Sequence, residues 1–115
     1  MAISEFETKR CERELEKFLE IRRPPPHIRD KLDIGYRMRD QSIEIFEIRS
    51  QWNKPDNKIE QSVAKTTYVK SKKHWKVFWQ RADMEWHGYD PCPTVRYLED
   101  FLTLVNEDAH ACFFG

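Results

Sequence analysis

Basic side chains gather in the middle of the sequence, and aromatic rings lie between them. The basic residues are Lys65, Lys70, Lys72, Lys73, Lys76 and Arg81, and the rings are those of Tyr68, Trp75, Phe78 and Trp79. Single-stranded nucleic acid is commonly bound in this way, because cations follow its phosphates and aromatic rings stack on its bases. Alternation along a strand groups Trp75 and Trp79 with Val77, on a face that we expect to be core. The candidate nucleic-acid-binding residues are therefore Lys65, Lys70, Lys72, Lys73, Lys76 and Phe78.

The charged residues are unevenly distributed, although the chain of 115 residues has no net charge. Residues 49–81 hold 9 basic and 2 acidic side chains, whereas residues 82–115 hold 1 basic and 7 acidic side chains. Two interpretations are open. The acidic segment can neutralise the basic one within the fold, or the basic segment can present a surface to an anionic partner.

The run Glu47-Ile48-Arg49 has the carboxylate and base of a metal-dependent nuclease, and Asp33, Glu44 and Lys65 are candidate companions. Such a site needs two or three carboxylates that converge on Mg²⁺ and a cation beside the attacked phosphate. Nucleases of this kind interleave helices with a mixed sheet, whereas this chain has the pattern of an uninterrupted meander. In the alternative interpretation, Glu47 and Arg49 form a solvent-facing stripe with cross-strand partners. We assign no catalytic residue and expect a binding protein rather than an enzyme.

Four histidines and cysteines near the end of the sequence are candidate metal ligands: His87, Cys92, His110 and Cys112. Zinc sites usually show tighter paired spacings than these, and a lone intracellular cysteine is more often a small core residue. Cys92 also lies near a predicted helix start, where a thiol can become nucleophilic with His87 as its base. No glycine-rich loop or nucleophile motif accompanies this pair. We predict no metal site and no cofactor, and the reactivity of Cys92 stays open.

The length of the chain indicates one domain, residues 1–115. Apolar residues make up 39% of the sequence, which is enough to form one core. No segment approaches the roughly 20 apolar residues of a membrane-spanning helix, and the first residues lack the order of a signal peptide. Three cysteines without a C-x-x-C spacing are typical of a reducing compartment. We expect a cytoplasmic protein with no membrane partner.

The helices and strands that must position these residues are predicted from the periodicity of apolar residues and from the capping, proline and turn residues between the periodic segments. Ser4 and Glu7 form a capping box for a first helix, which stops at the prolines of residues 24–26. Alternation predicts strands at 32–39, 42–49, 59–69, 74–81 and 84–89, with a turn-rich loop at 52–58. Thr94 is predicted to cap a final helix. The predicted fold class is α+β: an N-terminal helix, a five-stranded, mainly antiparallel meander sheet and a C-terminal helix.

Two local features add to this prediction. Ile43 and Ile45 alternate with polar residues, but Phe46 and Ile48 continue in the other phase, which predicts a bulge or a strand covered on both faces. The pair Phe113-Phe114 would invite association if it were exposed. We therefore expect the end of the chain to pack on its own domain or on a second copy.

Six runs of the sequence are specific in order and spacing: Arg22–Arg29, Phe46–Arg49, Ala64–Lys70, Trp75–Asp83, Trp86-His87 and Cys112–Gly115. Together they resemble a small bacterial family catalogued as domain of unknown function 3024, over essentially the whole chain. The resemblance implies a bacterial, single-domain protein and agrees with the cytoplasmic expectation. It carries no functional residues over to this sequence.

Function is predicted at the level of a class. We expect a protein-interaction or self-associating module, and a homodimer is one form that such a module can take. The alternative is single-stranded nucleic-acid binding through the basic and aromatic segment 49–81. The two hypotheses differ in whether the acidic segment 82–115 covers the basic one.

Overall fold

The computed structural model describes residues 4–51, 53–81, 83–108 and 113. Helix α1 (Glu5–Arg22) begins as the capping box predicts, because the backbone N–H of Glu7 donates to Oγ of Ser4 at 3.2 Å. It ends before Pro24, which cannot continue the helical hydrogen bonds. Its apolar stripe buries three side chains, those of Cys11, Leu15 and Phe18.

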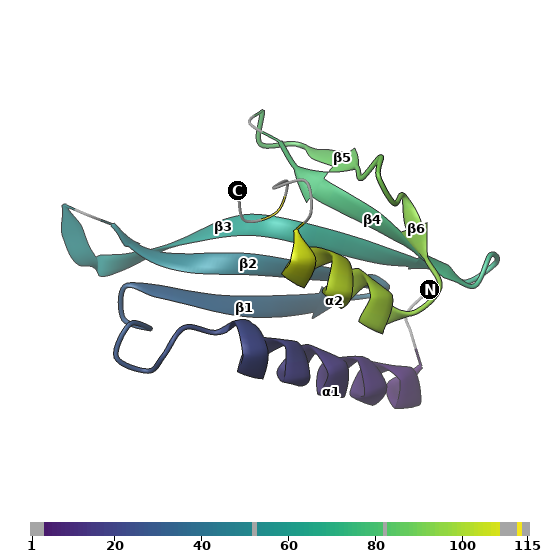
Figure 1. Cartoon of the computed structure of the whole chain (residues 1–115), viewed down its shortest axis with the longest axis horizontal. Helices are drawn as coiled ribbons and strands as arrows, with labels where there is room; N and C mark the ends of the chain where they lie inside the picture. The colour runs from purple at the N-terminus through teal and green to yellow at the C-terminus, as the bar shows by residue number, and fades with distance from the viewer. Residues whose placement is uncertain (1–3, 52, 82, 109–112, 114–115) are drawn as a thin grey trace.

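In the described part of the chain, six strands form one antiparallel sheet (Figure 1). They are β1 (Leu32–Arg39), β2 (Ser42–Gln51), β3 (Lys54–Val69), β4 (His74–Gln80), β5 (Trp86–Gly88) and β6 (Thr94–Val95), and helix α2 (Leu98–Glu107) follows them. Strands β1 to β5 are neighbours in chain order, and the short β6 pairs with β4 beside β5. The predicted α+β class, with a helix at each end of an antiparallel meander, is confirmed.

The hairpin between β2 and β3 is longer than the sequence predicts. A loop is predicted at residues 52–58, but β3 begins at Lys54, which pairs with Gln51. The next pair joins Ser50 to Lys58, so the residues between form an irregularity in the ribbon instead of a loop. The prediction was wrong because polar residues can also pair as strands where both faces of a ribbon meet water.

The connection into α2 also differs from the prediction. Thr94 does not cap this helix but lies in β6, where it pairs with Lys76 of β4. The helix begins at Leu98, and the preceding Tyr97 makes no capping hydrogen bond through its side chain. Thr94 is in a strand because of pairing between residues distant in the sequence. The three residues of β5 pair with one end of β4, and β6 pairs with the other end.

The change of phase in β2 corresponds to a bulge in the facing strand. Ile45 pairs with Ala64, whereas the next residue, Phe46, pairs with Ser62, so Val63 is the extra residue of β3. Val63 and Ala64 are consequently both buried in the core. Phe46 is buried on the opposite face, against Gly35, where an added Cβ would lie 3.1 Å from the Phe46 ring. Both predicted features are therefore present: a register shift at this point, whose extra residue belongs to β3, and side chains of β2 that are buried on both faces.

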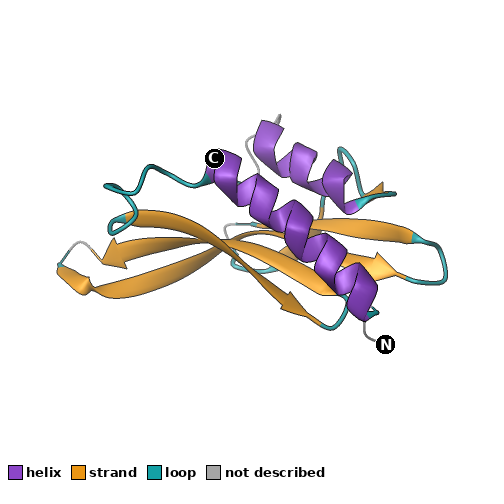
Figure 2. Cartoon of the chain, turned by 90° about the horizontal axis from the view of Figure 1, so that it is seen from below, coloured by secondary structure: helices purple, strands orange, loops and turns teal. Residues whose placement is uncertain are grey.

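Both helices pack on the same face of the sheet, and the core lies between the two layers (Figure 2). Its fully buried side chains come from every layer and include Leu15, Ile43, Ile45, Val77, Phe101 and Val105. Phe113 joins this core, with its ring centroid 4.8 Å from that of Tyr89, which confirms the expected packing for this residue. Phe114 and Cys112 lie outside the described residues.

Phe101→Ala should destabilise the protein by about 3–5 kcal/mol, because Phe101 is fully buried between α2 and the sheet and its removal leaves a cavity. Phe6→Ala is the matched control, since 76% of Phe6 is exposed on α1. Urea unfolding followed by circular dichroism measures both. Equal unfolding midpoints for the two variants would contradict the placement of the core.

Candidate nucleic-acid interface

The sheet face opposite the helices carries no helix in the described part of the chain (Figure 2). Strand pairing fixes which side chains share this face. Arg39 stands beside Ser42, which pairs with Thr67, and Thr67 pairs with Lys76. The next row across the strands consists of Arg37, Glu44, Lys65 and Phe78. We call this surface the open face, and define it by Arg37, Arg39, Glu44, Lys65, Lys76, Phe78 and Trp86.

Lys65 lies between two aromatic rings on the open face. Its Nζ is 5.7 Å from the ring centroid of Phe78 and 5.7 Å from that of Trp86. All three side chains are partly exposed to solvent. The arrangement follows from strand pairing, because Lys65 pairs with Phe78 while Trp86 pairs with Gln80, two residues further along β4. A cation and two rings are therefore held together on one solvent-facing surface.

Trp86 is a residue that the sequence analysis did not include in the candidate interface. Its position depends on the pairing of β5 with β4, which cannot be deduced from composition. The alternation of Met84 and Trp86 with polar residues was the available signal, because it placed Trp86 in a strand.

The six candidate residues do not form one surface. Lys65, Lys76 and Phe78 lie on the open face, whereas Lys70, Lys72 and Lys73 belong to the turn between β3 and β4. Of the turn lysines, Lys70 and Lys73 line a cavity on the helix side of the sheet. The structure thus divides one basic segment into two groups of cations with different surroundings.

The neighbouring carboxylates of the open face are already paired. Arg37 contacts Glu60 at 2.7 Å and Glu44 at 3.8 Å, and the hydroxyl of Ser62 donates to Glu44 at 2.6 Å. Among the described residues, no carboxylate forms an ion pair with Lys65 or Lys76. A shallow hollow of about 270 Å³ lies on this face, lined by Arg37, Arg39, Asp40, Ser42, Glu44 and Lys65.

The carboxylates of the nuclease hypothesis do not converge. Glu47 pairs with Ile34 on the helix face, whereas Glu44 lies on the open face. Glu47 is buried and accepts hydrogen bonds from the Arg49 guanidinium at 3.1 and 3.2 Å, so it does not belong to a solvent-facing stripe as the sequence suggested. Asp33 is held by Arg23 through two hydrogen bonds of 2.6 and 2.7 Å.

The predicted metal candidates have other partners. Nε2 of His87 lies 2.9 Å from Oδ2 of Asp83, and Glu85 brings a third ligand atom within 4.8 Å of both. The carboxylate of Asp83 also accepts the N–H of Glu85, which lowers its pKa, and the hydrogen bond from His87 adds to this shift. These bonds shape the exposed turn before β5. The thiol of Cys92 donates to the carbonyl of Thr94, and His110 and Cys112 lie outside the described residues.

Both edges of the sheet carry features that limit pairing with another strand. In edge strand β1, the backbone N–H of Ile34 donates to the Asp33 carboxylate at 2.8 Å, and Arg23 holds this carboxylate in place. The outer edge of β4 is covered by β5 and β6. An edge donor that is already bonded cannot pair with the strand of another molecule, so these features disfavour association through the sheet edges.

Asp33→Asn should cost about 1 kcal/mol near pH 7, because it breaks a partly buried bidentate ion pair. Hydrogen bonds from Arg23 lower the pKa of Asp33 in the folded state, so the pair stabilises the protein above the unfolded pKa of about 4 and less as the pH falls below it. Urea unfolding at neutral and acidic pH measures this. If the loss of unfolding free energy in Asp33→Asn stayed constant down to about pH 2, the stabilising role assigned to the Arg23–Asp33 ion pair would be contradicted. Asp56→Asn, at an exposed carboxylate of β3, is the control.

Comparison with known proteins identifies the family. A family model described as domain of unknown function (DUF3024) matches residues 3–115, so the chain belongs to this family. No curated protein and no solved structure matches the chain. In the described part of the chain, neither helix has the length and apolar character required to cross a membrane.

Proposed function

We propose that this member of the DUF3024 family binds single-stranded nucleic acid on the open face of its sheet. The observation that carries the proposal is the position of Lys65 between Phe78 and Trp86, on a face that no described helix covers. Bases stack on exposed aromatic rings, and a lysine beside the rings meets the phosphate that joins two bases.

The two rings have room for bases. Phe78 pairs with Gly88, and no atom lies within 4 Å of the place where a Cβ of Gly88 would stand. The absence of a side chain at Gly88 leaves space beside the Phe78 ring. Phe78 and Trp86 are diagonal neighbours on adjacent strands, which places their Cα atoms about 7–8 Å apart. Two successive bases of an extended strand can therefore each meet one ring.

Further cations extend the surface toward one end of the sheet. Lys76 and Arg39 are both exposed on the open face, and Lys72 is exposed in the adjoining turn. Contacts of this kind bind phosphates without reading sequence, so binding is expected to be general and sensitive to salt.

The features of the sheet edges weigh against the alternative of a self-associating module. Asp33 occupies the Ile34 donor of β1, and the opposite edge consists of the short strands β5 and β6, so these features disfavour a homodimer that continues the sheet. A dimer or a protein partner would have to use another surface. Measurement of mass in solution tests this alternative independently of nucleic acid.

The test is a fluorescence-anisotropy titration with labelled oligothymidylate. Affinity should fall with salt, with a slope of about −0.7 per neutralised phosphate. Phe78→Ala and Trp86→Ala should each weaken binding by about 1–3 kcal/mol, because each removes a stacking ring. Phe6→Ala, at an exposed ring of α1, is the matched control and should bind as the parent does.

Charge is tested with a second matched pair. Lys65→Gln should weaken binding for every oligonucleotide sequence alike, because a phosphate contact carries no sequence information. Lys17→Gln, on α1, removes the same charge from the opposite layer and should leave affinity unchanged. No binding at about 50 mM salt would overturn the proposal, since electrostatic binding is strongest at low salt. A concentration-dependent dimer in its place would support the interaction module.

A further inference from the structure

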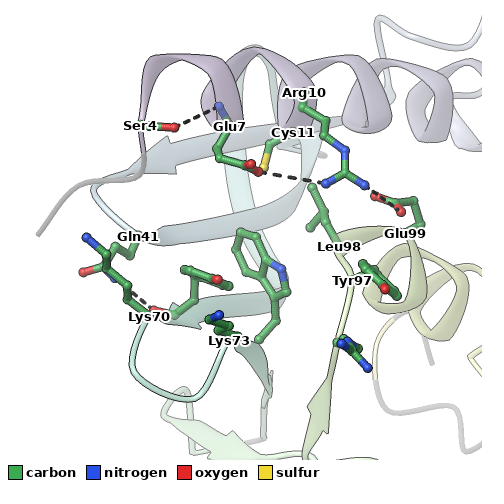
Figure 3. A pocket seen from close by; sticks show the side chains of 13 residues that line it. Ser4, Glu7, Arg10, Cys11, Gln41, Lys70, Lys73, Tyr97, Leu98 and Glu99 are labelled. Carbon is green, nitrogen blue, oxygen red and sulfur yellow. Dashed lines mark hydrogen bonds and ion pairs between the residues drawn. The ribbon is translucent and has the colours of Figure 1, made fainter.

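A cavity of about 480 Å³ lies at one end of the molecule, on the helix side of the sheet (Figure 3). Four parts of the chain form it: the start of α1, the start of α2, the turn between β1 and β2, and the turn between β3 and β4 with its flanking residues. Its volume is within the range of sites for small molecules. Its wall combines four cations with aromatic rings, and the charged members are Arg10, Lys70, Lys73, Arg96, Glu7 and Glu99.

The two carboxylates of the cavity are occupied by one of its cations. Arg10 contacts Glu7 at 3.9 Å and Glu99 at 3.4 Å, and so joins α1 to α2 (Figure 3). Lys73 and Arg96 form no ion pair with a carboxylate of the described residues. The cavity therefore keeps positive charge after its internal pairs are formed, which favours an anionic ligand.

The side chain of Trp75 also belongs to this wall. Trp75 is only 6% exposed and lines the cavity, and its indole N–H donates no hydrogen bond to another described residue, although the nitrogen itself is not buried. Such a donor usually finds a partner when the ring is buried. The first turn of α2, at Leu98 and Glu99, contributes to the same wall and has no side-chain cap. An anionic oxygen in the cavity would satisfy the indole donor and would also face the positive end of α2.

Aromatic surface at the cavity suits the rest of such a ligand. Tyr97 lies at the edge of the cavity and is 49% exposed. The guanidinium carbon of Arg96 lies 5.8 Å from the Tyr97 ring centroid. A flat ring can stack on Tyr97 while an attached phosphate meets Arg96 and Lys73. Cys11 also lines the cavity, but burial raises the pKa of its thiol to about 11, with a contribution from Glu7. The thiol is therefore protonated at neutral pH, so the cavity is suited to binding and not to nucleophilic reaction.

We propose that this cavity binds a nucleoside monophosphate, with its phosphate at Lys73, Arg96 and the Trp75 indole N–H and its base on Tyr97. The site is separate from the open face, whose cations Lys65 and Lys76 lie on the other side of the sheet. It does not depend on the binding of single strands there.

The experiment is an NMR titration of ¹⁵N-labelled protein with AMP, observed at the assigned indole N–H of Trp75. AMP should shift this signal and bind about tenfold more tightly than inorganic phosphate or adenosine, because each of these offers only part of the ligand. No shift of the Trp75 signal at millimolar AMP overturns the proposal. Equal affinity for AMP and inorganic phosphate overturns it as well, because Tyr97 would then contribute nothing.

Substitutions at the rim provide the control. Lys73→Gly and Arg96→Gln should each weaken AMP binding about tenfold, since each removes a charged hydrogen bond to phosphate. Lys73 has a positive φ of 52°, a conformation in which glycine is unstrained, so this variant should keep its fold. Lys72→Gln removes the same charge from the same turn but outside the cavity wall, and should bind AMP as the parent does. An equal loss in Lys72→Gln would reveal general charge attraction and overturn the site.

A strand that carries a 5′-phosphate presents the same chemical group as AMP. The titration is therefore repeated with a short oligonucleotide bearing either a 5′-phosphate or a 5′-hydroxyl. A Trp75 shift that requires the 5′-phosphate supports the site and assigns it to strand ends. A shift with AMP alone supports it and assigns it to the free nucleotide.

Discussion

The structure depends on the burial of one face of its sheet under two helices. Ile43, Ile45 and Val77 point to that face and are fully buried, and each such side chain contributes about 1.5–3 kcal/mol when it leaves water. Because strand side chains alternate, the same pairing places the intervening residues on the other face. The register that forms the core therefore also brings Lys65, Phe78 and Trp86 together where no described helix covers them. A shift by one residue would lose both.

The bulge at Val63 allows the apolar residues of both β2 and β3 to be buried in this register. It lets Val63 and Ala64 enter the core one after the other, and it leaves Phe46 on the open face against Gly35. The guanidinium of Arg37 lies 4.8 Å from the Phe46 ring centroid and also pairs with nearby carboxylates. This part of the open face is consequently closed by its own contacts. The accessible part lies toward β4 and β5.

The sequence contained enough information for the main elements, because their signals are local. The Ser4 capping box, the prolines after α1 and the alternation along β4 each predicted the observed structure. What could not be predicted depends on pairing between distant residues. The early start of β3 and the existence of β6 are examples, because each is stabilised by a partner strand and not by its own propensity.

The candidate site shows the same division. Lys76 and Phe78 were expected on one face because they alternate with Trp75, Val77 and Trp79 along the strand, and pairing of β3 with β4 adds Lys65 to that face. Lys70 and Lys73 were grouped with them by proximity in the sequence, but a turn has no such period and directs them to the cavity. The cavity itself draws residues from both helices and from β4, and no window of the sequence contains them all. Its members could be recognised only after the chain had been folded.

The most direct test of the open face is a map of backbone amide shifts on addition of unlabelled oligothymidylate to ¹⁵N-labelled protein at low salt. We predict that the largest shifts fall on Lys65, Lys76, Phe78 and Trp86, which lie on three strands and share one surface. The buried residues Leu15 of α1 and Phe101 of α2 should shift little. Largest shifts on the exposed side of α1 or at the β2–β3 hairpin, with the open-face amides unchanged, would contradict the proposal.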